Sequence, residues 1–342
     1  MARLAPVLIS AFLGFLIGVF SIFPFARSMG AKLLNGERCA SYYLLNRYIQ
    51  CEPEGNILKK KEFSVLKDTL KQHIFALIGQ GKVSHVSVYL RDLEFGPWMG
   101  INEDETYSAA SLLKVVVMLT LLRQEELFPG ILQQKIEVTP ENISPYVQDF
   151  MPERSIRSGE IYSVDELLEY MIVYSDNDAT NVIHNFLKSR SMDVDLFQST
   201  LEELGFIGQY KKNDNLTVKQ SASLFRLLYN SSFLNKSLSM KALDLLSRTT
   251  FQEGIRAGVS DHIVVATKFG ERITEDGERQ IHDCGIVYTD SSPYLLCIMT
   301  RGLDPKILAE VIAEISSRVY EEIDQRNRES EVIFRTTKKA SP

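Results

Sequence analysis

The spacing of apolar residues changes along the chain between the period of a helix and that of a strand. A helix is predicted from Glu62 onward, because apolar side chains recur there every three or four positions. They are Phe63, Leu66, Leu70, Ile74, Leu77 and Ile78. After two glycines, residues 83–93 alternate as a strand does, and Phe-Gly-Pro at 95–97 predicts a turn into a second strand.

The middle of the chain is dominated by helical patterns. Small residues at 108–110 lead into a strongly apolar helix over 112–122, and a long polar stretch follows over 139–162. Further helices are predicted at 164–174, 179–187, 193–204, 218–228 and 239–247.

Strand patterns return near the end, at 263–268, 284–289 and 295–300, before a long amphipathic helix over 304–328. Two strands with a helix, then a block of helices, then three strands with a helix indicate an α+β fold. We expect one five-stranded, mainly antiparallel sheet with the terminal helices on one face and an inserted all-helical lobe. The seam between sheet and lobe is the natural place for a site.

The N-terminus carries an uncharged, mostly apolar run over residues 4–26. At about 1.5 Å per residue it can span a hydrocarbon core of roughly 30 Å, whereas a secretory signal has a shorter apolar region and a small-residue cleavage site. We therefore predict one uncleaved transmembrane anchor at 1–26, with a cleaved signal as the alternative. A juxtamembrane spacer at 27–61, a domain at 62–330 and a polar tail at 331–342 follow.

The composition limits the classes of function. The 342 residues are 45% hydrophobic and 24% charged, with a net charge of -6, which is ordinary for a globular protein and gives no sign of nucleic-acid binding. The five histidines have no ligand-like spacing. We predict no metal, no cofactor and no nucleic-acid partner.

The four cysteines are compatible with an oxidising compartment without proving one. Cys39 and Cys51 could close a small loop between anchor and domain. Cys284 and Cys297 are close to opposite across a predicted hairpin. A pair of buried thiols is the alternative there.

Three short motifs carry candidate chemistry, and the first is Ser-x-x-Lys. In Ser111-Leu-Leu-Lys114 the serine begins the apolar helix, so the lysine lies on the same face one turn later in partly dry surroundings. Burial lowers the pKa of an amine and helps it act as a base for a serine nucleophile. Ser64-Val-Leu-Lys67 matches the motif equally well, in a helix that otherwise looks structural.

The second and third motifs are Ser175-Asp176-Asn177 and Lys268-Phe269-Gly270. The former ends a predicted helix, where Ser, Asp and Asn also serve as ordinary caps. Lys268 is predicted as the last residue of a buried strand, where a lysine is costly unless it has a partner or reaches water.

Together these motifs resemble those of the class A β-lactamases and related penicillin-binding serine enzymes, over roughly residues 62–330. The segment 159–181 resembles the one that carries Ser-Asp-Asn in that family, and 233–270 also fits. The first two motifs lie 64 residues apart. This separation is similar to that between the same two motifs in the family, and only Ser111, not Ser64, satisfies it. The resemblance implies a β-lactamase/transpeptidase-like fold.

The resemblance also implies roles for individual residues. Ser111 is the acylated nucleophile, Lys114 a general base, and Ser175 a proton relay to the leaving nitrogen. Asn177 holds the substrate's side-chain amide. Lys268 binds Ser175 and the substrate carboxylate, Gly270 belongs to the same substrate-binding strand, and the backbone N–H groups of Ser111 and Glu271 form the oxyanion hole.

Two departures from the family pattern stand out. Phe269 replaces the Thr or Ser whose hydroxyl binds the substrate carboxylate, which leaves Lys268 and Arg272 for that task. The Glu-x-x-Leu-Asn loop, whose glutamate activates the deacylating water, is missing between the second and third motifs. Glu202, Glu203 and Asp214 are nearby carboxylates with no assigned role.

These features predict a serine hydrolase of the class A β-lactamase family that opens β-lactam amides through a Ser111 acyl-enzyme and deacylates slowly. The alternatives are a D,D-carboxypeptidase or transpeptidase acting on D-Ala-D-Ala-like peptidoglycan stems, and a non-catalytic β-lactam-binding sensor. This chemistry favours an extracytoplasmic domain anchored through residues 4–26. Arg27, Lys32 and Arg38 after the run favour the opposite orientation by the positive-inside rule.

Overall fold

The computed structural model describes residues 44–45, 63–145, 148–191, 194–206, 215–289 and 292–339. The predicted anchor, most of the spacer, and both Cys39 and Cys51 lie outside these residues. Within the described residues no helix has both the length and the apolar character needed to cross a membrane.

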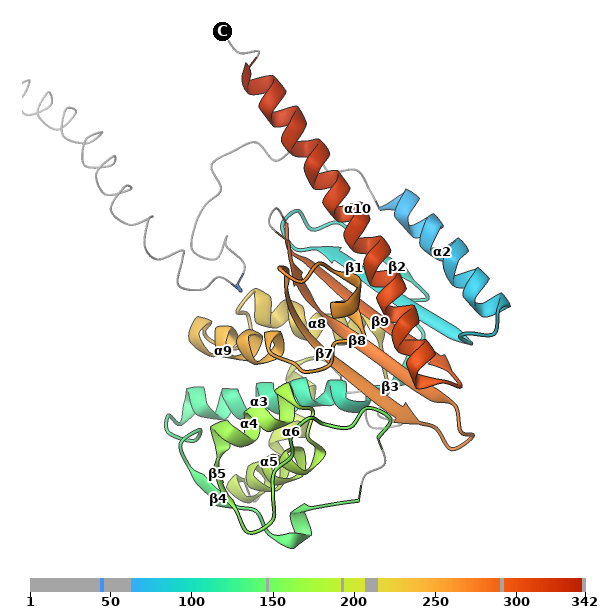
Figure 1. Cartoon of the computed structure of the whole chain (residues 1–342). Helices are drawn as coiled ribbons and strands as arrows, with labels where there is room; N and C mark the ends of the chain where they lie inside the picture. Colours follow the sequence, from blue (N-terminus) through green and yellow to red (C-terminus); the bar gives the residue numbers. More distant parts are fainter. Residues whose placement is uncertain are drawn as a thin grey trace, which may run out of the picture. The chain divides into compact units, whose positions relative to one another are not determined.

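A five-stranded antiparallel sheet forms the centre of the domain (Figure 1). Its strands are β1 (His85–Asp92), β2 (Trp98–Ile101), β7 (Val264–Ile273), β8 (Arg279–Tyr288) and β9 (Tyr294–Gly302). The order β2-β1-β9-β8-β7 places the N-terminal hairpin beside the C-terminal strands and leaves β7 at an edge. The expected sheet is confirmed.

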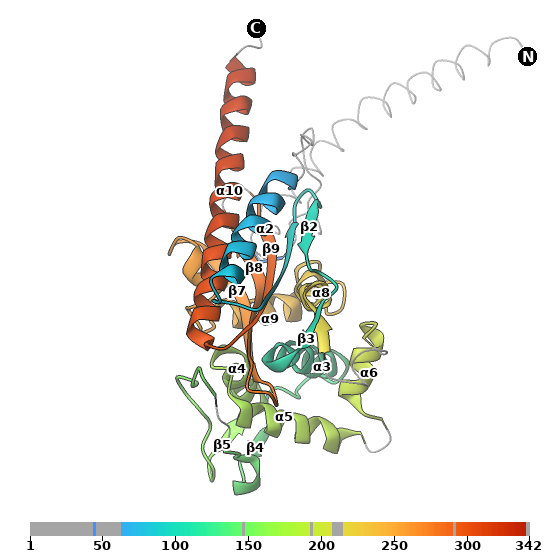
Figure 2. The ribbon, with the colours of Figure 1, turned by 90° about the vertical axis from the view of Figure 1, so that its right-hand side faces the viewer.

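The first and last helices of the described residues cover one face of this sheet. They are α2 (Ser64–Gly79) and α10 (Pro305–Lys339), which lie over the strands in Figure 2. Their apolar sides share one core with the sheet, including Leu70 of α2, Val88 of β1 and Ile312 of α10. Because burial of apolar surface drives this packing, the helical spacing in the sequence predicted the covered face. Helix α10 continues beyond its expected end at Arg328 into the predicted tail.

Helices occupy the middle of the chain, as expected. They are α3 (Leu113–Leu127), α4 (Val164–Val173), α5 (Asn177–Arg190), α6 (Leu196–Glu203), α8 (Val218–Tyr229) and α9 (Lys236–Ser247). Helix α8 packs on the sheet, on the face opposite to α10, whereas α3 to α6 form the inserted lobe (Figures 1 and 2).

Two small sheets that the sequence did not reveal support the lobe. Strand β3 (Thr106–Ser108) pairs with β6 (Asn215–Thr217), and β4 (Lys135–Glu137) pairs with β5 (Ile161–Ser163). Each strand has three residues, too few for a readable alternation of apolar and polar positions.

The structure corrects or decides two points about the late strands. Lys268 is not the last residue of its strand, because β7 continues to Ile273. The apolar run that predicted the strand ends at Lys268, but pairing with β8 carries it further. Cys284 and Cys297 are directly opposite in β8 and β9 and form a disulfide.

Candidate active site

Ser111 lies at a sharp transition from strand to helix. The chain passes from β3 through the 3-10 turn η3 (Ala110–Leu112) into α3, and Ala110 adopts a positive φ of 48°. A positive φ is unfavourable for a residue with a side chain and is retained where the surroundings enforce it. On the strand before it, the carbonyl of Ser108 contacts the ring Nε2 of buried His282 at 3.1 Å. Ser111 therefore sits on a constrained support.

The edge strand β7 approaches this turn at Gly270. A Cβ atom placed on Gly270 would lie 3.1 Å from the backbone nitrogen of Ser111 and 3.3 Å from that of Leu112. Only a residue without a side chain fits comfortably at this distance. The close approach brings the backbone after Gly270 beside the N–H of Ser111, as an oxyanion hole of Ser111 and Glu271 requires.

Lys114 is 4% exposed and connects the first motif to the second. Its Nζ donates to the carbonyl oxygen of Ser175 at 2.5 Å and to Oδ1 of Asn177 at 2.7 Å, and contacts Oγ of Ser175 at 3.3 Å. The ammonium is thus turned toward the second motif in this state.

Burial is the main influence on the charge of Lys114. It lowers the pKa of the lysine to about 7, against the opposing attraction of Asp176, Glu271 and Asp178. A lysine with such a pKa is largely neutral slightly above pH 7 and can accept a proton.

The second motif is held rigidly between α4 and α5. Ser175 has a φ of 58°, and Asp176 caps α5 by accepting from the N–H of Asp178. The other carboxylate oxygen of Asp176 accepts from the N–H of Ile156 at 2.8 Å. These contacts fix the turn. Asp176 is therefore a helix cap, and the catalytic interpretation applies to its neighbours Ser175 and Asn177.

Lys268 brings the third motif to the second. The side chain is fully buried, and its Nζ donates to Oγ of Ser175 at 2.8 Å and to the carbonyl of Phe269 at 3.0 Å. Burial, followed by the nearby Lys114, holds its pKa well below the usual range. The hydroxyl of Ser175 therefore has a lysine Nζ on either side.

Phe269 is buried in a cluster of aromatic rings. It stacks on Phe251 with ring centroids 4.2 Å apart, and the ring of Phe150 is steeply inclined to both, at 90° and 76°. The Nζ of Lys268 lies 4.4 Å from the centre of the Phe269 ring. The residue that departs from the family pattern is therefore packed into the protein and offers a ring face, not a hydroxyl, to the lysine.

The side chain of Glu271 ties β7 to the segment before Phe150. Its Oε2 accepts from the backbone N–H of Asp149 at 2.9 Å and from that of Phe150 at 3.2 Å. Asp149 also forms an ion pair with Arg279 of β8 at 2.9 Å. Burial raises the pKa of Glu271, and the two N–H donors oppose that shift.

Some of these residues line a groove of about 740 Å³. Ser111, Lys114, Asn177 and Glu271 lie along it, together with exposed Arg272. The groove continues along α5 past Asn181 to His184. The ring centroids of His184 and Phe197 are 5.6 Å apart. Asn177, Asn181 and His184 are spaced four and three residues apart, so they lie on one face of the helix. This spacing could have identified Asn181 and His184 from the sequence.

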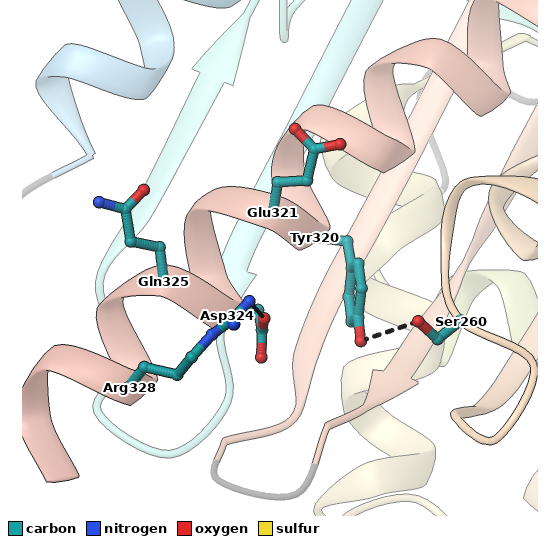
Figure 3. Close-up of a pocket in the computed structure, with 6 residues that line it drawn as sticks. All are labelled: Ser260, Tyr320, Glu321, Asp324, Gln325 and Arg328. Carbon is teal, nitrogen blue, oxygen red and sulfur yellow. Dashed lines mark hydrogen bonds and ion pairs between the residues drawn. The ribbon is translucent and has the colours of Figure 1, made fainter.

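A second hollow lies on α10, on the other face of the sheet (Figure 3). It is lined by Tyr320, Glu321, Asp324 and Arg328 of the helix, with Ser260 hydrogen-bonded to Tyr320. The motifs do not reach it. Among the described residues no three His, Cys, Asp or Glu side chains are grouped as around a metal ion.

The structure brings together every residue that the motifs singled out. Ser111, Lys114, Ser175, Asn177, Lys268, Gly270 and Glu271 meet at the seam of β7, α3 and α5. Of the carboxylates near the missing loop, Glu202 and Glu203 are on α6 and do not line the groove, and Asp214 lies outside the described residues. Sequence reasoning missed Phe150, Phe251 and the contacts of Glu271.

Comparisons with known proteins agree with this geometry. A model of the Beta-lactamase enzyme family, Beta-lactamase2, matches residues 69–323. The curated protein Beta-lactamase FAR-1 of Nocardia farcinica is 26% identical over 259 residues, which cover 72% of this chain and 80% of that protein.

Solved structures share the fold. The structure of PBP-A has a TM-score of 0.63 at 20% identity, covering 79% of this chain and 100% of its own. A class A β-lactamase from Mycobacterium abscessus has a TM-score of 0.62 at 22% identity, covering 74% of this chain and 98% of its own. An acyl-enzyme complex of a PBP-A mutant with penicillin G has a TM-score of 0.64 at 20% identity, covering 79% and 100%.

Proposed function

Because this chain belongs to the β-lactamase enzyme family, and is a serine β-lactamase-like hydrolase, we propose that it opens β-lactam amides through an acyl-enzyme on Ser111. The observation that carries the proposal is Lys114. A buried lysine with a pKa of about 7 joins the groove of Ser111 to Ser175 and Asn177.

The proposed acylation begins with the proton of Ser111. Neutral Lys114 takes the proton of the Ser111 hydroxyl, whose oxygen attacks the lactam carbonyl. The N–H groups of Ser111 and Glu271 stabilise the oxyanion of the tetrahedral intermediate. As the C–N bond breaks, the hydroxyl of Ser175 protonates the nitrogen and is resupplied by the protonated Lys114 beside it. Lys114 turns from Ser175 to Ser111 for the first step, since catalytic hydrogen bonds often tighten only with substrate.

Deacylation is proposed to be slow. The family's glutamate loop is missing from the sequence, and Glu202 and Glu203 are not on the groove. We expect the mass of penicillin on Ser111 to persist when the intact protein is followed by mass spectrometry over time. Fast, steady hydrolysis of nitrocefin without a burst would refute slow deacylation but not acylation.

A D,D-carboxypeptidase or transpeptidase is the second candidate, favoured by the missing loop and by a groove that extends along α5 beyond Asn177. Release of terminal D-alanine from a pentapeptide would establish it. Stoichiometric labelling of Ser111 without turnover of either substrate would instead favour a β-lactam-binding sensor.

The proposed location is extracytoplasmic, with an anchor at residues 4–26. Its support is the apolar run and the proposed peptidoglycan-like substrates, which lie outside the cytoplasm. Protease added to intact cells should digest the domain, and protection of the domain until lysis would contradict this orientation.

A further inference from the structure

The third motif leaves a substrate carboxylate without its expected partners. Phe269 has no hydroxyl, and its ring is packed against those of Phe251 and Phe150. Lys268 is fully buried and already donates to Ser175 and to the carbonyl of Phe269. A carboxylate on an incoming molecule therefore needs donors outside the motif, and exposed Arg272 on the groove is one of them.

A carboxylate of the protein itself is bound beside the third motif, on the residue that follows it. The backbone N–H groups of Asp149 and Phe150 both donate to Oε2 of Glu271, at 2.9 and 3.2 Å. Hydrogen bonds from N–H groups to a charged oxygen are among the stronger ones in proteins. Glu271 follows Gly270, whose backbone touches the turn of Ser111, and it lines the same groove.

The two N–H groups are held in place independently of Glu271. Phe150 is fixed by its ring contacts with Phe251 and Phe269, and Asp149 by its ion pair with Arg279 at 2.9 Å. If the carboxylate of Glu271 left, both donors would still be available beside the groove. A preorganised pair of donors binds a carboxylate without the entropy loss of ordering a loop.

We propose that the backbone N–H groups of Asp149 and Phe150 form the carboxylate subsite of this enzyme, occupied in the free protein by the side chain of Glu271. A carboxylate-bearing substrate displaces Glu271 and takes its two hydrogen bonds. The inference rests on the proposed function for the identity of the substrate. It makes Glu271 an internal competitor, so shortening that side chain strengthens binding of the carboxylate.

The test is a calorimetric titration of the full-length chain carrying Ser111→Ala, with benzylpenicillin and with its methyl ester. Since Ser111→Ala prevents acylation, binding alone is measured. The ratio of the two dissociation constants isolates the carboxylate from the rest of the ligand. Glu271→Asp retains the charge but is one methylene too short to hold both donors, and Glu271→Gln retains the size but removes the charge.

Glu275→Gln is the matched control. Glu275 lines the same groove and is also a glutamate, but the N–H groups of Asp149 and Phe150 donate to Glu271. Thermal melting verifies that each variant is folded. We expect Glu271→Asp and Glu271→Gln to raise the preference for the acid over the ester about tenfold, and Glu275→Gln to change it less than twofold.

An unchanged preference in both Glu271 variants would overturn the subsite, as would failure of the acid to bind any variant. An equal gain with Glu275→Gln would also overturn it, because removal of charge would then explain the effect. Absence of acylation in the wild-type chain would refute the proposed function, whereas these titrations would still decide the subsite.

Discussion

The chain contains two copies of Ser-x-x-Lys, and their surroundings differ almost completely. Ser64 is exposed and begins the first turn of α2 together with half-buried Lys67. Ser111 lies on a constrained turn, and Lys114 is buried against Ser175 and Asn177. Identical spacing therefore yields a surface helix in one place and a site in the other. The chemistry depends on which elements pack against the motif.

The largest test of this comparison is removal of each serine hydroxyl. We expect Ser111→Ala to abolish covalent labelling by a fluorescent penicillin, because Ser111 is the groove hydroxyl that the first motif pairs with buried Lys114. Ser64→Ala should label like the wild type. Gel fluorescence of both variants measures this, and equal labelling of all three proteins would disprove the assignment.

Replacement of the two lysines should have a smaller effect on acylation than loss of the Ser111 hydroxyl. Loss of a general base costs about 10²- to 10⁴-fold, so Lys114→Met should slow the acylation of Ser111 by that amount. Lys67→Met should change the rate less than twofold. Stopped-flow measurement of acylation decides the point. A normal acylation rate in Lys114→Met would show that another group acts as the base.

Two glycines extend the comparison to the backbone. A Cβ on Gly270 would press on the nitrogens of Ser111 and Leu112, whereas one on Gly79, at the end of α2, meets nothing within 4 Å. Since small misplacements near the reacting atoms cost up to about 10²-fold, we expect Gly270→Ala to slow acylation by roughly 10-fold to 10²-fold. Gly79→Ala should leave the acylation rate, measured in the same stopped-flow assay, unaltered. If Gly270→Ala also reacts normally, the close approach is unimportant.

The pH profile should reveal the altered lysine. Lys114 is active when neutral, and its pKa is lowered to about 7, so the acylation rate should rise with pH and level off above that value. Between pH 8 and pH 6 the neutral fraction falls about tenfold, and the rate should fall with it. Rates of labelling across this range, with Lys67→Met as the control, test the sign. A rate that falls as the pH rises would contradict it.

The fold was largely predictable from the sequence. The helical spacing of α2 and the late strands are local patterns, and they predicted the five-stranded sheet and the inserted lobe. The predicted end of β7 was wrong because pairing with β8, not the apolar run, extends the strand past Lys268. Strands β3 to β6 were missed because three residues carry no period.

The candidate site divides in the same manner. The ordered motifs predicted Ser111, Lys114, Ser175, Asn177 and Lys268, because motif spacing along the chain is visible without a structure. The ring cluster was not predictable. Phe150 is far from the other two rings in the sequence, and Phe269 lies on β7 whereas Phe251 lies outside that strand. The contact of Glu271 with Asp149 likewise spans 122 residues.

By itself, the sequence determined the longer helices and strands, the order of the motifs and the two departures from the family pattern. These are properties of residue identity and local spacing. Only the tertiary structure decided how deeply Lys114 and Lys268 are buried and what binds Glu271. Burial and long-range contacts set pKa values and occupy donors, and both depend on segments that meet only after folding.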